Sequence, residues 1–140
     1  MVVDRHGVPL VATLSAANCH DSTQFTVLVD AVPPIHRPAG HLGRPRKRPD
    51  KLHADKAYDF PRCRQVLHAR HIQVRIARRG VDSSTKLGRH RWVVERTLAW
   101  LARYRRLTIR YERLATLHQA FLSLACALIC LRFLHRDHQF

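Results

Sequence analysis

Short strand-like segments alternate with helix-like segments along almost the whole chain of 140 residues. Strands are indicated by apolar runs or strict alternation, and helices by apolar residues three and four apart behind a capping residue or a proline. This order predicts one domain of the mixed α/β class with one modest core. The expected strands are 1–4, 8–15, 51–54 and 72–76, and the expected helices are 21–32, 59–71, 89–104 and 114–134.

Turn and capping residues predict where several elements begin. A His6-Gly7 turn joins the first two strands into a hairpin. Asp21 or Ser22 is expected to cap the first helix. Asp59 is expected to cap the second helix, which has a proline in its first turn.

Two stretches of the sequence have unusual compositions. Residues 33–50 hold five prolines and two glycines, which predicts a long loop that is functional or disordered. The longest apolar run, 120–131, has twelve residues and predicts a buried helix, because a membrane-spanning helix needs about 20. Residues 1–3 resemble the start of a strand and not a secretory signal, so the expected location is the cytoplasm, away from membranes.

The net charge of +15 predicts a polyanionic partner, most often nucleic acid. The basic residues concentrate in 37–51 and 86–113. A solvated basic face is the alternative interpretation of this charge. Cys126 and Cys130 precede two histidines, which suggests zinc, but their spacing matches no common zinc finger and favours small core residues.

Two of the ten acidic residues have positions that suit catalysis. Asp55 follows the strand 51–54, and open α/β sheets place ligands at the carboxyl ends of their strands. Glu95 lies in the helix 89–104 among arginines, although it can simply pair with Arg91 one turn earlier. Two such carboxylates suit Mg²⁺ or Mn²⁺ acting on a phosphodiester. The basic residues expected to bind DNA are Lys56, Arg89, Arg91, Arg96 and Arg103.

Several segments resemble the carboxyl half of bacterial insertion-sequence DDE transposases of the insertion-sequence-four/five-like group. The segments are Ala-Asp55-Lys-Ala-Tyr58-Asp59, Arg75-Ile-Ala-Arg-Arg, and Gly88-Arg-His-Arg91-Trp-Val-Val-Glu95-Arg-Thr-Leu-Ala-Trp-Leu. The opening Val3-Asp4-Arg-His-Gly-Val-Pro-Leu fits as well, so the resemblance covers nearly the whole chain.

The resemblance implies an RNase H-like mixed sheet flanked by helices. It implies that Asp55 is the second and Glu95 the third acidic metal ligand, with Arg91 touching a phosphate. The implied reaction is Mg²⁺-dependent attack by water at the element ends, followed by attack of the freed 3′-OH on double-stranded target DNA. Gly88 and Ala102 depart from the family's signature Tyr and Lys, and Ala57 replaces a frequent glycine.

The family's first acidic ligand lies on a first, central strand upstream of the hairpin that begins here at Met1. Asp4 is no substitute, because the family also has a non-catalytic Asp at this turn. We therefore expect residues 1–140 to form a single, amino-terminally truncated and incomplete catalytic domain that is inactive alone. It comprises the loop 33–50 and a helical part, 85–134, with the last carboxylate. Its partner is expected to be an upstream transposase half or a full-length protomer.

Two alternatives come from other classes of protein. One is a non-catalytic basic remnant that only binds DNA, so that loss of Asp55 or Glu95 leaves binding intact or strengthens it. The other is a basic RNA-associated protein. The spacing of Trp92 and Trp100 favours a helix core over a surface for stacking bases.

Overall fold

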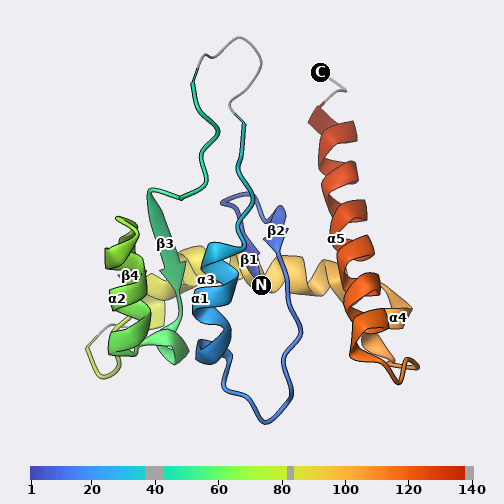
Figure 1. Ribbon diagram of the computed structural model, residues 1–140, viewed down its shortest axis with the longest axis horizontal. Helices are drawn as coiled ribbons and strands as arrows, with labels where there is room; N and C mark the ends of the chain where they lie inside the picture. Colours follow the sequence, from blue (N-terminus) through green and yellow to red (C-terminus); the bar gives the residue numbers. More distant parts are fainter. Residues whose placement is uncertain (37–42, 82–83, 138–140) are drawn as a thin grey trace. The chain divides into compact units, whose positions relative to one another are not determined.

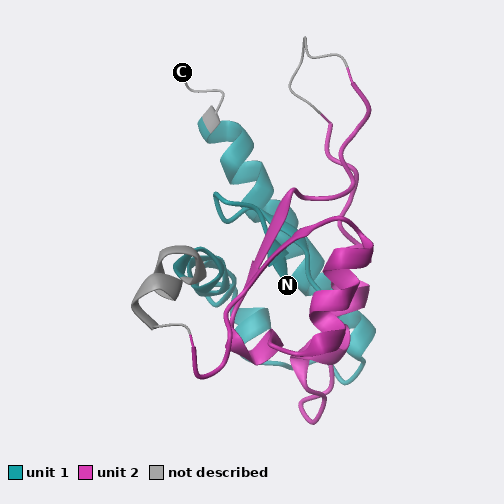
Figure 2. Ribbon diagram, turned by 90° about the vertical axis from the view of Figure 1, so that its left-hand side faces the viewer, with its two compact units in different colours: residues 1–14, 92–140 teal, residues 15–91 magenta. Residues whose placement is uncertain are grey.

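A computed structural model describes residues 1–36, 43–81 and 84–137, with the backbone alone described for 84–91 and for 137 (Figure 1). The middle of the proline-rich loop, 37–42, lies outside the described residues. The chain divides into two compact units, residues 1–14 with 92–140 and residues 15–91, here called unit 1 and unit 2 (Figure 2).

Unit 1 contains the predicted hairpin. The strands β1 (Val2–Val3) and β2 (Pro9–Val11) pair antiparallel, and Gly7 in their turn has φ +85°, a backbone conformation that favours glycine. Asp4 Oδ1 accepts hydrogen bonds from the backbone N–H groups of His6 and Val8, each at 2.8 Å. This carboxylate therefore stabilises the turn.

The predicted second strand, 8–15, is shorter in the structure because a side chain replaces a neighbouring strand beyond Val11. Gln119 Nε2 donates to Ala12 O, and Leu14 N donates to Gln119 Oε1, both at 3.0 Å. These two backbone groups are thus satisfied without a sheet partner.

The helical part of unit 1 comes from α3 (Ser84–Leu101), from Trp92 onward, with the short α4 (Arg105–Thr108) and the long α5 (Ala115–Asp137). Its core contains Leu101, Ala125 and Ile129, with Trp100 and Phe133 packed against them. The start of α3 precedes the predicted one because Lys86 and Leu87 are good helix formers, and Gly88 costs only about 1 kcal/mol within a helix.

The prediction that residues 120–131 form a buried helix is right about the helix and wrong about its burial. Ala125 and Ile129 are buried, but Leu124, Leu128 and Leu131 are exposed. By length and composition, α5 could also cross a membrane, a property that it shares with core helices of soluble proteins.

Unit 2 is built around a parallel β-α-β arrangement. The strands β3 (Lys51–Ala54) and β4 (Gln73–Ile76) pair in parallel, with Lys51 opposite Gln73 and Ala54 opposite Ile76. The helix α2 (Pro61–Ala69) connects them, and α1 (Phe25–Asp30) precedes them in the chain. The core of the unit contains Phe25, Val29, Cys63, Leu67, Ile72 and Ile76. Strand β3 has the predicted bounds, and β4 begins one residue later than predicted.

Unit 2 also contains two 3-10 helices. The structure shows that two of the predicted helix caps are wrong. The first, η1 (Asp21–Gln24), is capped by His20, whose Nδ1 accepts from Ser22 N at 3.2 Å, and not by Asp21 or Ser22. The second, η2 (Lys56–Tyr58), follows β3. Asp59 does not cap α2, because arginines occupy its carboxylate; Phe60 holds that position without a side-chain bond. The helix ends before the predicted residue 71 because His71 has φ +55°.

Candidate functional site

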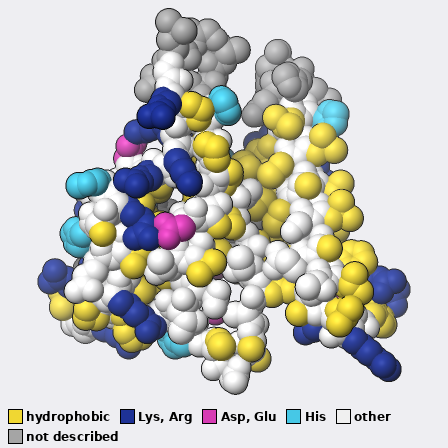
Figure 3. All heavy atoms as spheres, in the orientation of Figure 1, with side chains coloured by type: hydrophobic (Ala, Val, Ile, Leu, Met, Phe, Trp, Pro, Cys, Tyr) yellow, Lys and Arg dark blue, Asp and Glu magenta, His cyan; other side chains and the backbone are white. Residues whose placement is uncertain are grey.

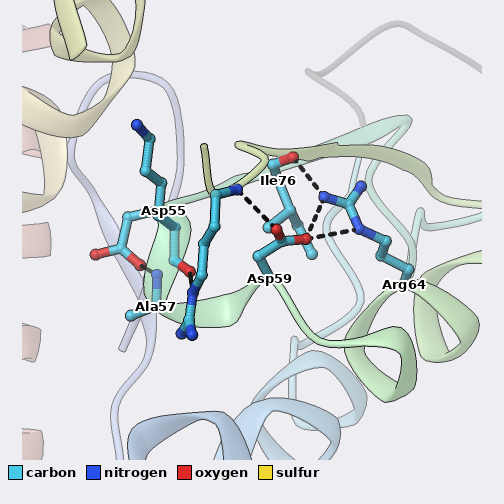
Figure 4. A network of polar contacts seen from close by, with 7 residues as sticks. Asp55, Ala57, Asp59, Arg64 and Ile76 are labelled. Atoms are coloured by element: carbon cyan, nitrogen blue, oxygen red, sulfur yellow. Dashed lines mark hydrogen bonds and ion pairs between the residues drawn. The ribbon is translucent and has the colours of Figure 1, made fainter. Parts of the chain in front are cut away.

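Asp55 lies at the carboxyl end of β3, as predicted, and its carboxylate is oriented by the backbone that follows. It is the N-cap of η2, and its Oδ1 accepts from Ala57 N at 2.8 Å (Figure 4). The side chain is half-buried, and its second oxygen accepts no hydrogen bond from the residues that the structure describes. Carboxylate oxygens are the ligands that Mg²⁺ prefers, so the donor at this position fits a magnesium ion.

Asp59 ties the turn after Asp55 to α2 and to the end of β4. Its Oδ1 accepts from Arg64 Nη2 at 2.6 Å, and its Oδ2 accepts from Arg79 N at 2.9 Å (Figure 4). Arg64 also donates to Ile76 O at 3.0 Å, and Arg79 Nε donates to Lys56 O at 2.9 Å. These contacts, here called the Asp59 clamp, hold both ends of the turn that carries Asp55.

The Asp59 clamp predicts a pH-dependent stability. The hydrogen bond from the Arg79 backbone, and then that from Arg64, lower the pKa of Asp59 below its usual 3.8. The clamp therefore stabilises the fold above the unfolded-state pKa of about 4 and loses this contribution as the pH falls through the lower, folded value. We expect Asp59→Asn to lower the urea midpoint at neutral pH, and the difference from wild type to shrink towards about pH 3.

Asp50→Asn is the matched control for this experiment, because the carboxylate of Asp50 forms an exposed pair with Arg46. Exposed pairs contribute little, so its urea midpoint should follow that of the wild type at every pH. A difference for Asp59→Asn that does not change with pH contradicts the role of the ionised carboxylate.

A second acidic residue of unit 2, Asp21, acts on Tyr58 together with Asp55. Burial, and then the charges of Asp21 and Asp55, raise the pKa of the Tyr58 hydroxyl. The turn η1, which begins at Asp21, packs against η2. The sequence alone indicates only a capping role for Asp21. The signal for another role was that His20, immediately before it, can cap the same turn.

Glu95 lies on an exposed part of α3 whose next turn is fixed to the hairpin of unit 1. The fully buried Thr97 donates from Oγ1 to Gly7 O at 2.7 Å. Arg96 lies over the rings of Trp92 and Trp100, 4.3 and 4.9 Å from their centroids, and donates to His6 O. Glu95 therefore projects from a firmly held stretch of helix in unit 1, whereas Asp55 belongs to unit 2.

The residues predicted to bind DNA have different surroundings. Arg103 is exposed beside a shallow hollow of unit 1 that Arg132, Arg136 and two aromatic rings also line. Arg96 is engaged in the contacts just described, and Lys56 is half-buried in η2. The side chains of Arg89 and Arg91 lie outside the described residues.

The surroundings of Cys126 and Cys130 disfavour the zinc interpretation of these two thiols. Burial raises the pKa of the Cys126 and Cys130 thiols, which disfavours the thiolate form that zinc requires. The described residues include no group of three His, Cys, Asp or Glu that could hold a metal ion.

Comparison with known proteins identifies the family. Residues 1–130 match the family described as "Transposase DDE domain". A relative from Burkholderia cepacia, named "Putative transposase for insertion sequence element IS402", is 48% identical over 139 residues. These residues are 99% of this chain and 64% of the relative, so the chain spans less than two thirds of the relative's length. No solved structure matches the chain. The chain belongs to the family of transposase DDE domains.

Proposed function

We propose that the chain acts in DNA transposition, with Asp55 and Glu95 as the second and third carboxylates of a metal-dependent strand-cleavage and strand-transfer site. The observation that carries the proposal is Asp55: a carboxylate at the end of a parallel strand, oriented by Ala57 N–H and held by the Asp59 clamp. The antiparallel pair β1–β2 and the parallel pair β3–β4 are both pairings of an RNase H-like sheet, which supports that fold as part of the proposal.

In this proposal the chain's own residues bind the metal ion, orient the DNA and neutralise its phosphates. Asp55 and Glu95 would hold a divalent ion such as Mg²⁺ or Mn²⁺, which would supply activation of the attacking oxygen and stabilisation of the leaving oxygen. Asp55 and Glu95 provide hard oxygen donors on rigid elements. Exposed arginines hold the DNA backbone in place without reading its sequence.

A third carboxylate is needed, and most described acidic residues are engaged elsewhere. Asp4 stabilises the hairpin turn, Asp30 pairs with Arg70, and Asp59 forms the clamp. Glu112 pairs with Arg106 and lies close to His118. We therefore propose that the missing carboxylate comes from an upstream transposase half or another protomer, and that the chain alone is inactive.

The chain alone should not cleave element-end DNA in Mg²⁺ or Mn²⁺. A chimera in which it replaces the matched part of the Burkholderia cepacia relative should cleave, because the remaining third of that protein is then present. Gel analysis of end-labelled DNA measures both. Cleavage by the chain alone would contradict this expectation. If that cleavage is lost in Asp21→Asn, the third carboxylate is Asp21, whose charge raises the pKa of Tyr58 together with that of Asp55.

The arginines around the hollow of unit 1 favour a second candidate function, DNA binding without catalysis. Arg103, Arg132 and Arg136 are exposed there, and Arg136 lies over the Phe133 ring. DNA affinity should fall steeply with salt, and Arg103→Ala should lower the slope of log K against log salt by about 1. Arg46→Ala is the matched control, because Asp50 already neutralises Arg46.

Fluorescence anisotropy with a labelled duplex at several salt concentrations measures these slopes. An Arg103→Ala slope equal to that of the wild type removes Arg103 from the interface. Binding that survives Asp55→Asn and Glu95→Gln, without cleavage by any form of the protein, favours the non-catalytic function.

A further inference from the structure

A row of leucines along α5 is left uncovered in the structure. Their exposed fractions range from 39% to 63%, and Figure 3 shows hydrophobic side chains gathered along this helix. Together they expose on the order of 500 Å² of apolar surface, towards the upper end of the largest patches on monomers, which are often functional. The leucines are Leu114, Leu117, Leu124, Leu128, Leu131 and Leu134.

The spacing of this row is that of a helix–helix seam. With the half-buried Phe121 included, the positions 114, 117, 121, 124, 128 and 131 are separated alternately by three and four residues. This is the a/d pattern of a heptad repeat, whose side chains interlock with those of a second helix. Leu134, the last leucine of the row, lies at a g position, as do Ala120 and Ala127. All three are exposed and widen the seam without adding charge.

The opposite side of α5 is already used within unit 1. Ala125 and Ile129 pack in the core with Leu101. Gln119 binds the backbone that continues β2, and Cys130 contacts Pro9 O at 3.7 Å. Lipid therefore cannot surround this helix while unit 1 stays folded. A partner can cover α5 only on the side that carries the leucine row.

We propose that the leucine row of α5 binds the same row of a second copy of this chain. Charged residues make up 25% of the chain, yet none occurs from Leu114 to Leu131. Two copies that each carry +15 repel, and this neutral row lets them meet without placing like charges face to face. Such a two-fold contact is self-complementary. It buries about 1,000 Å² in total, which is about the minimum for a biological interface and predicts a dimer of modest affinity.

This proposal does not rest on the proposed function, because it involves neither metal nor DNA. Purified, nuclease-treated chain should be a dimer by light scattering after size-exclusion chromatography. Leu124→Glu should raise the dissociation constant by more than about tenfold, because it places a charge in the seam, and it should retain the far-UV circular dichroism of the wild type. Val27→Glu, at an equally exposed apolar position of α1, is the matched control and should remain dimeric.

Salt separates self-association from association through residual nucleic acid. Raising salt from about 0.1 to about 0.5 M should strengthen the dimer because it screens the repulsion between the two copies. Bridging by nucleic acid weakens under the same change. If Leu124→Glu loses helical signal, Leu117→Gln repeats the test in the same row with a milder change.

Three results overturn the proposal. One is a wild-type chain that stays monomeric at about 100 µM, a concentration at which an association with Kd near 1 µM would be complete. Another is a folded Leu124→Glu or Leu117→Gln variant that dimerises like the wild type. The third is a wild-type monomer that binds neutral phosphatidylcholine vesicles while Leu124→Glu does not, which assigns the row to a lipid surface.

Discussion

Asp55→Asn and Glu95→Gln should each abolish strand cleavage by the chimera with the Burkholderia cepacia relative. Each change removes one anionic oxygen donor and leaves the size of the side chain almost unchanged. The loss should exceed about 100-fold, because changes to the outer hydrogen-bond partners of metal ligands already cost 10–100-fold. End-labelled DNA and a titration with Mn²⁺ measure the activity and its metal dependence.

Asp50→Asn is the control for Asp55→Asn, because it removes the same charge immediately before β3, at the other end of the strand. It should cleave like the wild type. Variants of Asp55 or Glu95 that fold and cleave at the wild-type rate contradict the proposed site. Equal losses in Asp50→Asn and Asp55→Asn would indicate a general effect of charge on DNA binding, and not metal binding.

Gly7→Ala should cause a large loss of stability in unit 1. Gly7 has φ +85°, and an added Cβ would lie 2.9 Å from Thr97 Oγ1 and 3.1 Å from Arg96 Nη2. The left-handed backbone costs an L residue about 1–2 kcal/mol. Crowding of the buried Thr97 adds about 1–3 kcal/mol. Urea unfolding followed by circular dichroism should therefore show a total loss of about 2–5 kcal/mol.

Gly80→Ala separates the two costs, because Gly80 has φ +76° but, apart from its chain neighbours, no described residue has an atom within 4 Å of an added Cβ. It should lose only the backbone contribution of about 1–2 kcal/mol. Adding Thr97→Ala to Gly7→Ala should recover part of the crowding cost, so that the two changes are not additive. Equal losses for Gly7→Ala and Gly80→Ala would show that the contact with Thr97 contributes nothing.

The sequence predicts the parts of the fold whose signals are local. The apolar alternation and the following carboxylate place β3 and Asp55 correctly, and the His6-Gly7 turn places the hairpin. Capping was predicted less well, because several polar residues compete at each helix start. His20 replaces Asp21, and Asp59 binds arginines that are five and twenty residues away along the chain.

The burial of α5 could not be predicted from its composition. Its heptad row and its core face are both apolar, and the side that unit 1 buries depends on where β2 and α3 pack. The role of Arg96 was hidden for a similar reason. A helical arginine four residues from each of two tryptophans is compatible with DNA binding and with stacking, and the structure shows the stacking.

The hydrogen bonds of Gln119 also bear on aggregation. A strand that ends with free N–H and C=O groups invites strands of other molecules to pair with it. Gln119 occupies Ala12 O and Leu14 N at the place where β2 stops, so an incoming strand must first displace this amide. One side chain of α5 thus protects the open end of the hairpin from edge-to-edge association between molecules.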